Sequence, residues 1–122
     1  MSNKPIILYV DDEVINLQLF EINLSKHYEV ITANNGSEGL EILEKNQDIK
    51  LVASDMKMPN MNGLEFIKKA KQIYPHLPFF LLTGFETNLE IEEALDTQLI
   101  LKHLKKPFNI GAMHTAFSKV IT

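Results

Sequence analysis

Three carboxylate side chains stand directly after short apolar runs of this sequence. Asp11 and Asp12 follow residues 6–10, and Asp55 follows residues 51–54. If these side chains meet in the fold, their charges repel, and the pKa of at least one rises unless a cation neutralises them. A divalent cation with oxygen ligands removes the repulsion, and Mg²⁺ suits a site with few carboxylates. The residue types therefore predict a Mg²⁺ site.

Two further side chains have the chemistry to hold a phosphoryl group beside such a cation. Lys106 carries a compact positive charge for phosphoryl oxygens, and the hydroxyl of Thr83 is a neutral donor. Asp55 would then be the nucleophile that forms an acyl phosphate. Catalysis would consist mainly of positioning and charge neutralisation, as in phosphoryl transfer generally.

Each of these residues also has a simpler structural explanation when it is taken alone. Asp11 and Asp12 are suited to capping a helix, and Asp55 to a turn before a proline. Thr83 is suited to a strand end, and Lys106 to a solvated position before a rigid turn. Their common position at strand ends, in the residue types that one mechanism needs, favours the functional interpretation.

The segments that position these side chains alternate between strand and helix patterns. Apolar runs predict strands at residues 6–10, 28–32, 51–54, 78–83 and 99–104. Helical spacing predicts helices at 17–26, from a cap at Ser37 through 43, at 64–74, 87–96 and 110–120. Strands that are apolar on both faces predict an α/β fold with a doubly wound parallel sheet between helices. In such a sheet, ligands bind beyond the carboxyl ends of the strands.

The composition of the chain indicates a single domain and argues against several classes of function. A chain of 122 residues that is 45% hydrophobic fits one domain, residues 1–122, with its own core. The absence of cysteine excludes a thiol nucleophile and a zinc–thiolate site. The net charge is −4 and all twelve basic residues are lysines, which argues against direct nucleic-acid binding. Because no long apolar run or signal segment is present, no membrane contact and a cytoplasmic location are expected.

Four segments of the chain match a known family in the same order. They are ILYVDDE at 7–13, DMKMPNMNG at 55–63, LTG at 82–84 and KKPF at 105–108. The second pattern is highly specific. From end to end, the chain resembles the receiver domain of two-component response regulators, chemotaxis regulators among them. The resemblance implies a flavodoxin-like fold with five parallel strands in the order 2-1-3-4-5 and five helices.

The resemblance also implies a role for each site residue. Asp55 would accept a phosphoryl group from a phosphohistidine on a sensor histidine kinase or a histidine phosphotransfer protein. Asp12 and Asp55 would ligate Mg²⁺ through their side chains and Lys57 through its backbone carbonyl, while Asp11 would act through a metal-bound water. The domain would be a signalling phosphoacceptor that catalyses only its own phosphorylation and dephosphorylation, with no organic cofactor.

Signal output would depend on the second half of the chain. The resemblance implies that Thr83 and Lys106 bind the phosphoryl oxygens and shift when phosphate arrives. It places the output surface for an effector protein or domain at about 87–121, in a monomer or a phosphorylation-dependent dimer. His103 stands where the family often has an aromatic switch residue. Imidazole is polar and can titrate, so a switch and an exposed strand histidine are both open.

Two positions tune the phosphate lifetime in this family, and here they hold Lys57 and Phe85. We expect the bulky Phe85 to restrict the attacking water and to prolong the phosphorylated state.

Three other functions compete with the receiver. Small phosphatases of the haloacid-dehalogenase type use an aspartyl nucleophile, Mg²⁺ and a lysine, but carry their two aspartates one residue apart after the first strand. A nucleotide-binding module is disfavoured because residues 10–13 have no glycine and two carboxylates. A pseudo-receiver without phosphorylation is disfavoured because all five site residues are present. Whether the chain acts alone or as the first domain of a longer protein stays open.

Overall fold

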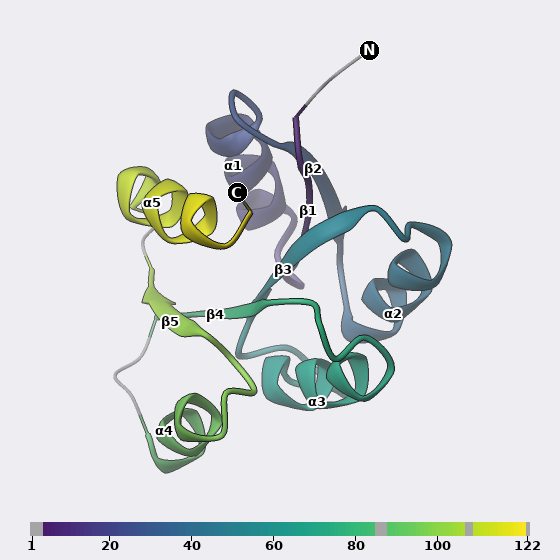
Figure 1. Ribbon diagram of the computed structural model, residues 1–122, viewed down its shortest axis with the longest axis vertical. Helices are drawn as coiled ribbons and strands as arrows, with labels where there is room; N and C mark the ends of the chain where they lie inside the picture. The colour runs from purple at the N-terminus through teal and green to yellow at the C-terminus, as the bar shows by residue number, and fades with distance from the viewer. Residues whose placement is uncertain (1–3, 85–87, 107–108, 122) are drawn as a thin grey trace.

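Strands and helices alternate strictly in the computed structural model, which describes residues 4–84, 88–106 and 109–121 (Figure 1). The strands are β1 (Ile6–Val10), β2 (Glu29–Ala33), β3 (Ile49–Asp55), β4 (Phe79–Thr83) and β5 (Lys102–Lys105). The helices are α1 (Val14–Leu24), α2 (Gly36–Lys45), α3 (Gly63–Ile73), α4 (Leu89–Asp96) and α5 (Ile110–Ile121). All five strands pair in parallel in the order β2-β1-β3-β4-β5, which confirms the predicted fold.

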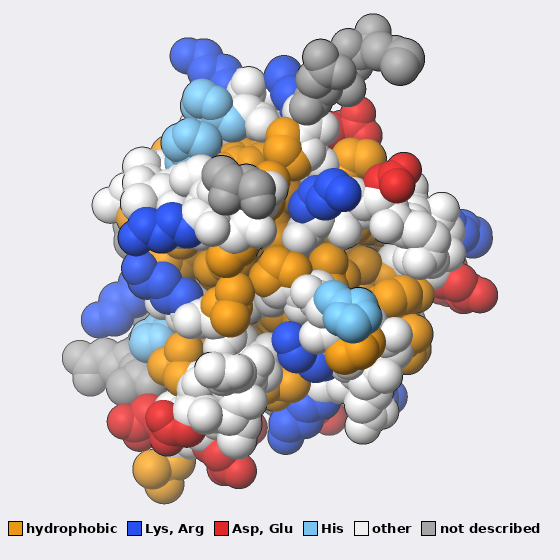
Figure 2. Space-filling model, viewed as in Figure 1, with side chains coloured by type: hydrophobic (Ala, Val, Ile, Leu, Met, Phe, Trp, Pro, Cys, Tyr) orange, Lys and Arg blue, Asp and Glu red, His pale blue; other side chains and the backbone are white. Residues whose placement is uncertain are grey.

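Each face of the sheet has its own hydrophobic core. Tyr9 and Phe20 belong to the cluster under α1 and α5, whereas Val10 and Phe66 belong to the cluster under α2, α3 and α4. Neighbouring residues of β1 thus point to opposite faces, as the period of a strand requires. On the face seen in Figure 2, hydrophobic side chains gather near the centre and charged ones lie mainly around the edge. Within the described segments, no helix is both long and apolar enough to cross a membrane.

The fifth strand is shorter than predicted. Residues 99–104 were expected to be extended, but β5 begins only at Lys102. The amides of Leu99 and Ile100 both donate to the carbonyl of Ala94, at 2.9 and 3.3 Å, so these residues wrap around the end of α4. The side chain of Ile100 points from this turn into the core and is buried there. An apolar run marks residues that pack inward, but it does not separate a strand from a buried turn.

Helices α2, α3 and α4 each begin at an asparagine cap, and at α4 the cap is Asn88. Asn35 caps α2 by accepting from the amide of Glu38 at 2.8 Å, so the predicted cap, Ser37, lies inside the first turn instead. At α3, the side chain of Asn62 accepts from the amide of Glu65 at 2.9 Å, and the Glu65 carboxylate accepts from the amide of Asn62 at 3.0 Å. This capping box anchors the loop that follows β3.

Gly63 allows α3 to begin directly against the end of β3. A Cβ at this position would lie 2.2 Å from the carbonyl oxygen of Asp55 and 2.9 Å from the side chain of Leu81. The amide of Gly63 also donates to the carbonyl of Met56 at 2.8 Å. The close approach of the two backbones therefore requires glycine here.

We expect Gly63→Ala to lower the free energy of unfolding by about 1–3 kcal/mol, because the added methyl group must push α3 away from β3. Gly111→Ala is the matched control, since Gly111 is exposed on α5 and its added Cβ would lie 3.6 Å from the side-chain oxygen of Asn109, an ordinary contact distance. The control should be as stable as the parent or slightly more stable. Urea unfolding of the three chains measures the difference, and a Gly63→Ala chain as stable as the parent would contradict the packing argument.

Candidate functional site

Three aspartate side chains meet at the carboxyl edge of the sheet. Asp11 and Asp12 follow β1, and Asp55 is the last residue of β3. One carboxylate oxygen from each lies within 4.8 Å of the others. Asp11 and Asp55 are buried, whereas Asp12 is exposed. The structure thus brings together the three carboxylates that the sequence analysis placed at strand ends.

Backbone hydrogen bonds hold the site residues to the sheet even where the strands have ended. The amide of Asp11 donates to the carbonyl of Ala33 on β2 at 3.1 Å. The amide of Lys106 donates to the carbonyl of Thr83 on β4 at 2.9 Å. The backbone positions of both side chains are therefore set by neighbouring strands rather than by a free loop.

The acidic pair after β1 does not cap the first helix. α1 begins at Val14, earlier than predicted, and its N-cap is Glu13, whose side chain makes no cap hydrogen bond. The Asp11 carboxylate instead accepts from the amide of Glu13 at 3.0 Å through Oδ1. This turn directs the carboxylate of Asp11 into the sheet edge, so helix capping does not explain the two aspartates.

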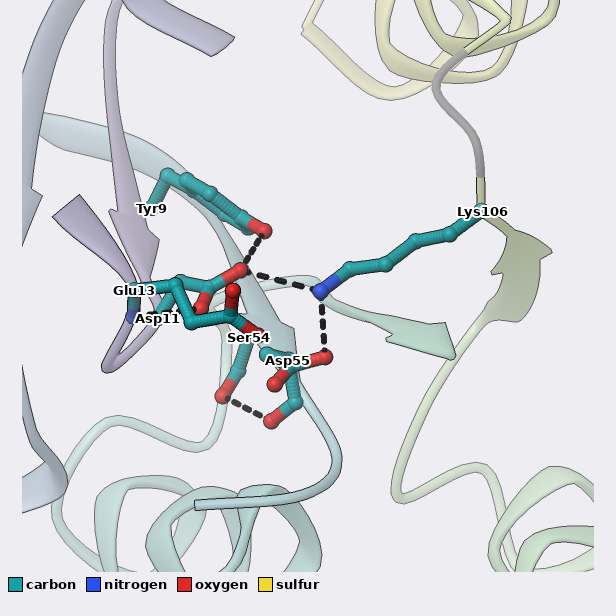
Figure 3. A network of polar contacts seen from close by, with 6 residues as sticks. All are labelled: Tyr9, Asp11, Glu13, Ser54, Asp55 and Lys106. Atoms are coloured by element: carbon teal, nitrogen blue, oxygen red, sulfur yellow. Dashed lines mark hydrogen bonds and ion pairs between the residues drawn. The ribbon is translucent and has the colours of Figure 1, made fainter. Parts of the chain in front are cut away.

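Lys106 bridges two of the carboxylates (Figure 3). Its Nζ lies 3.0 Å from Oδ2 of Asp11 and 2.8 Å from Oδ1 of Asp55. It is therefore not the solvated lysine of the simpler explanation. Three carboxylates and one ammonium group carry a formal charge of −2, which one divalent cation would balance. The donor set consists of hard oxygens, as Mg²⁺ prefers.

The site perturbs the pKa values of two of its members. Burial raises the pKa of Asp55, and the charge of Asp11 adds to the rise, although the contact with Lys106 opposes it. Burial by itself would lower the pKa of Lys106, but its hydrogen bonds to Asp55 and Asp11 outweigh burial and raise that pKa. Lys106 is therefore the stable positive charge of the site, and Asp55 is a carboxylate that a further cation would help to ionise.

A cleft of about 610 Å³ opens above these groups. Thr83 is buried at the end of β4 and forms part of the wall of the cleft, while the exposed Lys57 lies on the rim of the cleft. Asp11 is fully buried below it. The residues that line the cleft are Asp12, Glu13, Asp55, Lys57, Met58, Pro59, Thr83, Gly84 and Lys106. Apart from Asp11, every predicted metal or phosphoryl ligand is among them.

His103 lies apart from this cleft. It is half-buried in β5, where its Cα pairs with that of Leu81, and it is not among the lining residues. Because its neighbour Leu104 packs under α1 and α5, strand alternation directs His103 to the other face. Phe85 and Thr87 lie outside the described residues, so the expectations for phosphate lifetime and for the start of the output surface stay predictions.

Tyr9 is a member of the site that the sequence analysis missed. Its hydroxyl donates to Oδ2 of Asp11, the same oxygen that Lys106 contacts. Burial, followed by the charge of Asp11, raises the pKa of Tyr9 well above its usual range, so the phenol keeps its proton. The signal was available: residues two apart in a strand share a face, and a buried tyrosine hydroxyl needs a partner.

Comparisons with known proteins agree with this geometry. A family model described as the response regulator receiver domain matches residues 7–118. Sporulation initiation phosphotransferase F from Bacillus subtilis is 31% identical over 121 residues, which cover 99% of this chain and 96% of that protein. Transcriptional regulatory protein GlrR from Escherichia coli is 32% identical over 123 residues, covering 99% of this chain. The chain spans only 27% of the length of GlrR.

A solved structure with the same fold contains Mg²⁺. Response regulator TrrA from Thermotoga maritima, described as a complex with Mg(2+)-BeF, superimposes with a TM-score of 0.82. It is 28% identical, and the match covers 94% of this chain and 97% of that one.

Proposed function

Because this chain belongs to the response regulator receiver domain family, we propose that Asp55 accepts its phosphoryl group and that residues 1–122 form one receiver domain. A receiver is a phosphoacceptor in two-component signalling, not an enzyme that turns over an external substrate, and this answers the phosphatase alternative. The observation that carries the proposal is the 2.8 Å contact between Lys106 and Asp55 within the aspartate triad. It supports Asp55 because a phosphoryl group bonded to this carboxylate would lie beside the ammonium group that neutralises its oxygens.

The proposed transfer is an attack by a carboxylate oxygen of Asp55 on the phosphorus of a phosphohistidine. The new P–O bond forms as the P–N bond breaks, and the electron pair leaves with the imidazole nitrogen. Lys106 turns from the carboxylates to the phosphoryl oxygens, and the hydroxyl of Thr83 donates to one of them. In hydrolysis, a water oxygen attacks the same phosphorus, the carboxylate of Asp55 leaves and inorganic phosphate is released.

The acidic residues would hold the metal ion. We assign Mg²⁺ to the side chains of Asp12 and Asp55 and to the backbone carbonyl of Lys57, with Asp11 acting through a bound water. The formal charge of −2 and the oxygen donors support this assignment, as does the similarity to TrrA, which was solved with Mg²⁺. When bound, Mg²⁺ supplies neutralising charge to the carboxylate and the phosphoryl oxygens.

Receiver domains interact with histidine kinases or phosphotransfer proteins, and we propose that such a donor contacts α1 beside the cleft. α1 begins two residues after Asp12, and it exposes four large apolar side chains. They are Val14, Ile15, Leu19 and Ile22. Such a group of exposed apolar side chains is typical of a protein contact surface. The receiver domain family is cytoplasmic, which supports a cytoplasmic location for this chain.

The proposed output surface comprises α4, β5 and α5, where an effector protein or domain would bind. His103 belongs to this surface through β5, and its role as a switch is part of the proposal. Phosphorylation would change this surface in a monomer or through dimer formation.

We expect a small phosphodonor such as acetyl phosphate, together with Mg²⁺, to add one phosphoryl group per chain. The group should be stable in acid and lost in base, because it is an acyl phosphate. Chelation of divalent cations should prevent labelling, since the triad would keep its uncompensated negative charge. Intact-mass measurement detects the product, and a chain that stays unlabelled, or that instead turns over p-nitrophenyl phosphate, would refute the proposal.

A further inference from the structure

Three donors surround the buried carboxylate of Asp11 (Figure 3). The hydroxyl of Tyr9 and the ammonium group of Lys106 both bind Oδ2, and the amide of Glu13 binds Oδ1. Asp11 is 0% exposed, so protein donors replace the water that would otherwise solvate its charge. The transfer proposed above accounts for Lys106, but it leaves the hydroxyl of Tyr9 without a role.

The three donors differ in how freely they can move. Tyr9 is fully buried in β1, and its ring stacks on Phe20 with centroids 4.1 Å apart and planes 10° apart. The amide of Glu13 belongs to the backbone at the start of α1. Lys106 comes from the other end of the chain on a flexible stem, and its side chain is 19% exposed. Of the three, Lys106 is the donor that can change partners.

We propose that Tyr9 is a positioning residue for phosphoryl transfer, whose hydroxyl keeps Asp11 bound and oriented when Lys106 leaves it. This inference rests on the proposed function. Without the hydroxyl, departure of Lys106 would leave Oδ2 of a buried carboxylate with neither of its two protein donors before the metal ion and its water arrive. A buried charged acceptor without a partner is costly, so Lys106 would stay on Asp11. It would then compete with the incoming metal ion.

The expected consequence is weaker Mg²⁺ binding in Tyr9→Phe. Loss of a residue that orients a metal ligand typically reduces metal affinity by about 10- to 100-fold, and because Asp11 reaches the metal through a water we expect the low end of this range, a rise of about tenfold in the dissociation constant for Mg²⁺. Phosphorylation by acetyl phosphate should need correspondingly more Mg²⁺. At saturating Mg²⁺ its rate should return to within about threefold of the parent, because Tyr9 is not among the residues that line the cleft where the phosphoryl group and the metal would bind.

Tyr28→Phe is the matched control. Tyr28 is also buried, and its hydroxyl is hydrogen-bonded to Nδ1 of His114 at 2.9 Å, which ties it to α5 rather than to the aspartates. Titration calorimetry with Mg²⁺ on the parent, Tyr9→Phe and Tyr28→Phe chains gives the three dissociation constants. The control should bind Mg²⁺ within about twofold of the parent, because its lost hydroxyl does not orient a site carboxylate.

Two outcomes would overturn the inference. The first is a Tyr9→Phe chain that binds Mg²⁺ as tightly as the parent or more tightly. The second is an equal loss of affinity in both variants, which would point to general loosening of the fold. If acetyl phosphate still labels the parent chain, either result overturns the role of Tyr9 but leaves the proposed function intact. A parent chain that is not labelled at all refutes the proposed function itself.

Discussion

Asp55→Asn is expected to abolish phosphoryl incorporation while the chain remains folded. Asparagine keeps the shape of the side chain but replaces the anionic oxygen nucleophile with a neutral amide. Loss of a covalent nucleophile costs several orders of magnitude in rate, so we expect labelling by acetyl phosphate and Mg²⁺ to fall by more than about 1,000-fold. Intact-mass measurement over a time course gives the rate for the parent and the variant.

Asp48→Asn is the matched control, because Asp48 is an exposed aspartate just before β3 and undergoes the same chemical change. The control should be labelled at the rate of the parent. Labelling of Asp55→Asn at a rate close to that of the control would show that another residue accepts the phosphoryl group.

Comparison of the parent with Asp55→Asn also gives a pH test of the Asp55 environment. Because burial raises the pKa of Asp55, the folded chain holds this proton more tightly than the unfolded chain. Stability therefore falls as pH rises from the ordinary aspartate pKa of about 4 through the raised value. Asparagine has no carboxyl proton to release, so Asp55→Asn should not lose stability in this way. The free energy of unfolding of the parent should therefore fall relative to that of Asp55→Asn as pH increases. Urea unfolding across this range would show a constant difference if Asp55 were unperturbed.

Lys106→Met is expected to destabilise the domain in the absence of Mg²⁺. Lys106 is the cation that touches both buried carboxylates, Asp11 and Asp55, and methionine offers a similar length without charge. Removing one partner of a buried ion pair costs about 3–5 kcal/mol, and we expect about 3 because the lysine side chain is still 19% exposed. The pKa of Asp55 should rise further, so the variant should lose more stability than the parent as pH increases.

The Lys106→Met variant should be phosphorylated at least about 100-fold more slowly than the parent, since it lacks a fixed charge for the phosphoryl oxygens.

Mg²⁺ should restore much of the lost stability of Lys106→Met, because it neutralises the same carboxylates and binds only the folded chain. Urea unfolding with and without Mg²⁺ measures this rescue. Lys105→Met is the control, because Lys105 is the exposed neighbour in the chain. Equal stability of Lys105→Met and Lys106→Met would refute the proposed role of the ion pairs.

Strand-end positions made the centre of the site predictable from sequence. Asp11 and Asp55 end apolar runs and Lys106 directly follows β5, and parallel strands bring such positions to one edge. The contact of Lys106 with both aspartates was not predicted, because the spacing of residues gives no side-chain distances. Tyr9 was overlooked because it lies within an apolar run, where its hydroxyl was not considered separately from its ring.

Local boundaries were harder to predict than the site. Ser37 and Asn35 are both good cap residues, and only the backbone geometry selects Asn35. Leu99 and Ile100 are as apolar as strand residues, yet they close the end of α4. In the first case the pattern identified the start of a helix but not its capping residue, and in the second it identified buried residues but not the turn to which they belong.

The central claim is that Asp55 carries the phosphoryl group, and direct location of that group tests it most sharply. Borohydride reduces an acyl phosphate to an alcohol and so marks the acceptor permanently. Reduction of the labelled parent chain, followed by peptide mass spectrometry, should find the mark at Asp55 alone. A mark at Asp11, at Asp12 or at any residue outside the cleft would contradict the account.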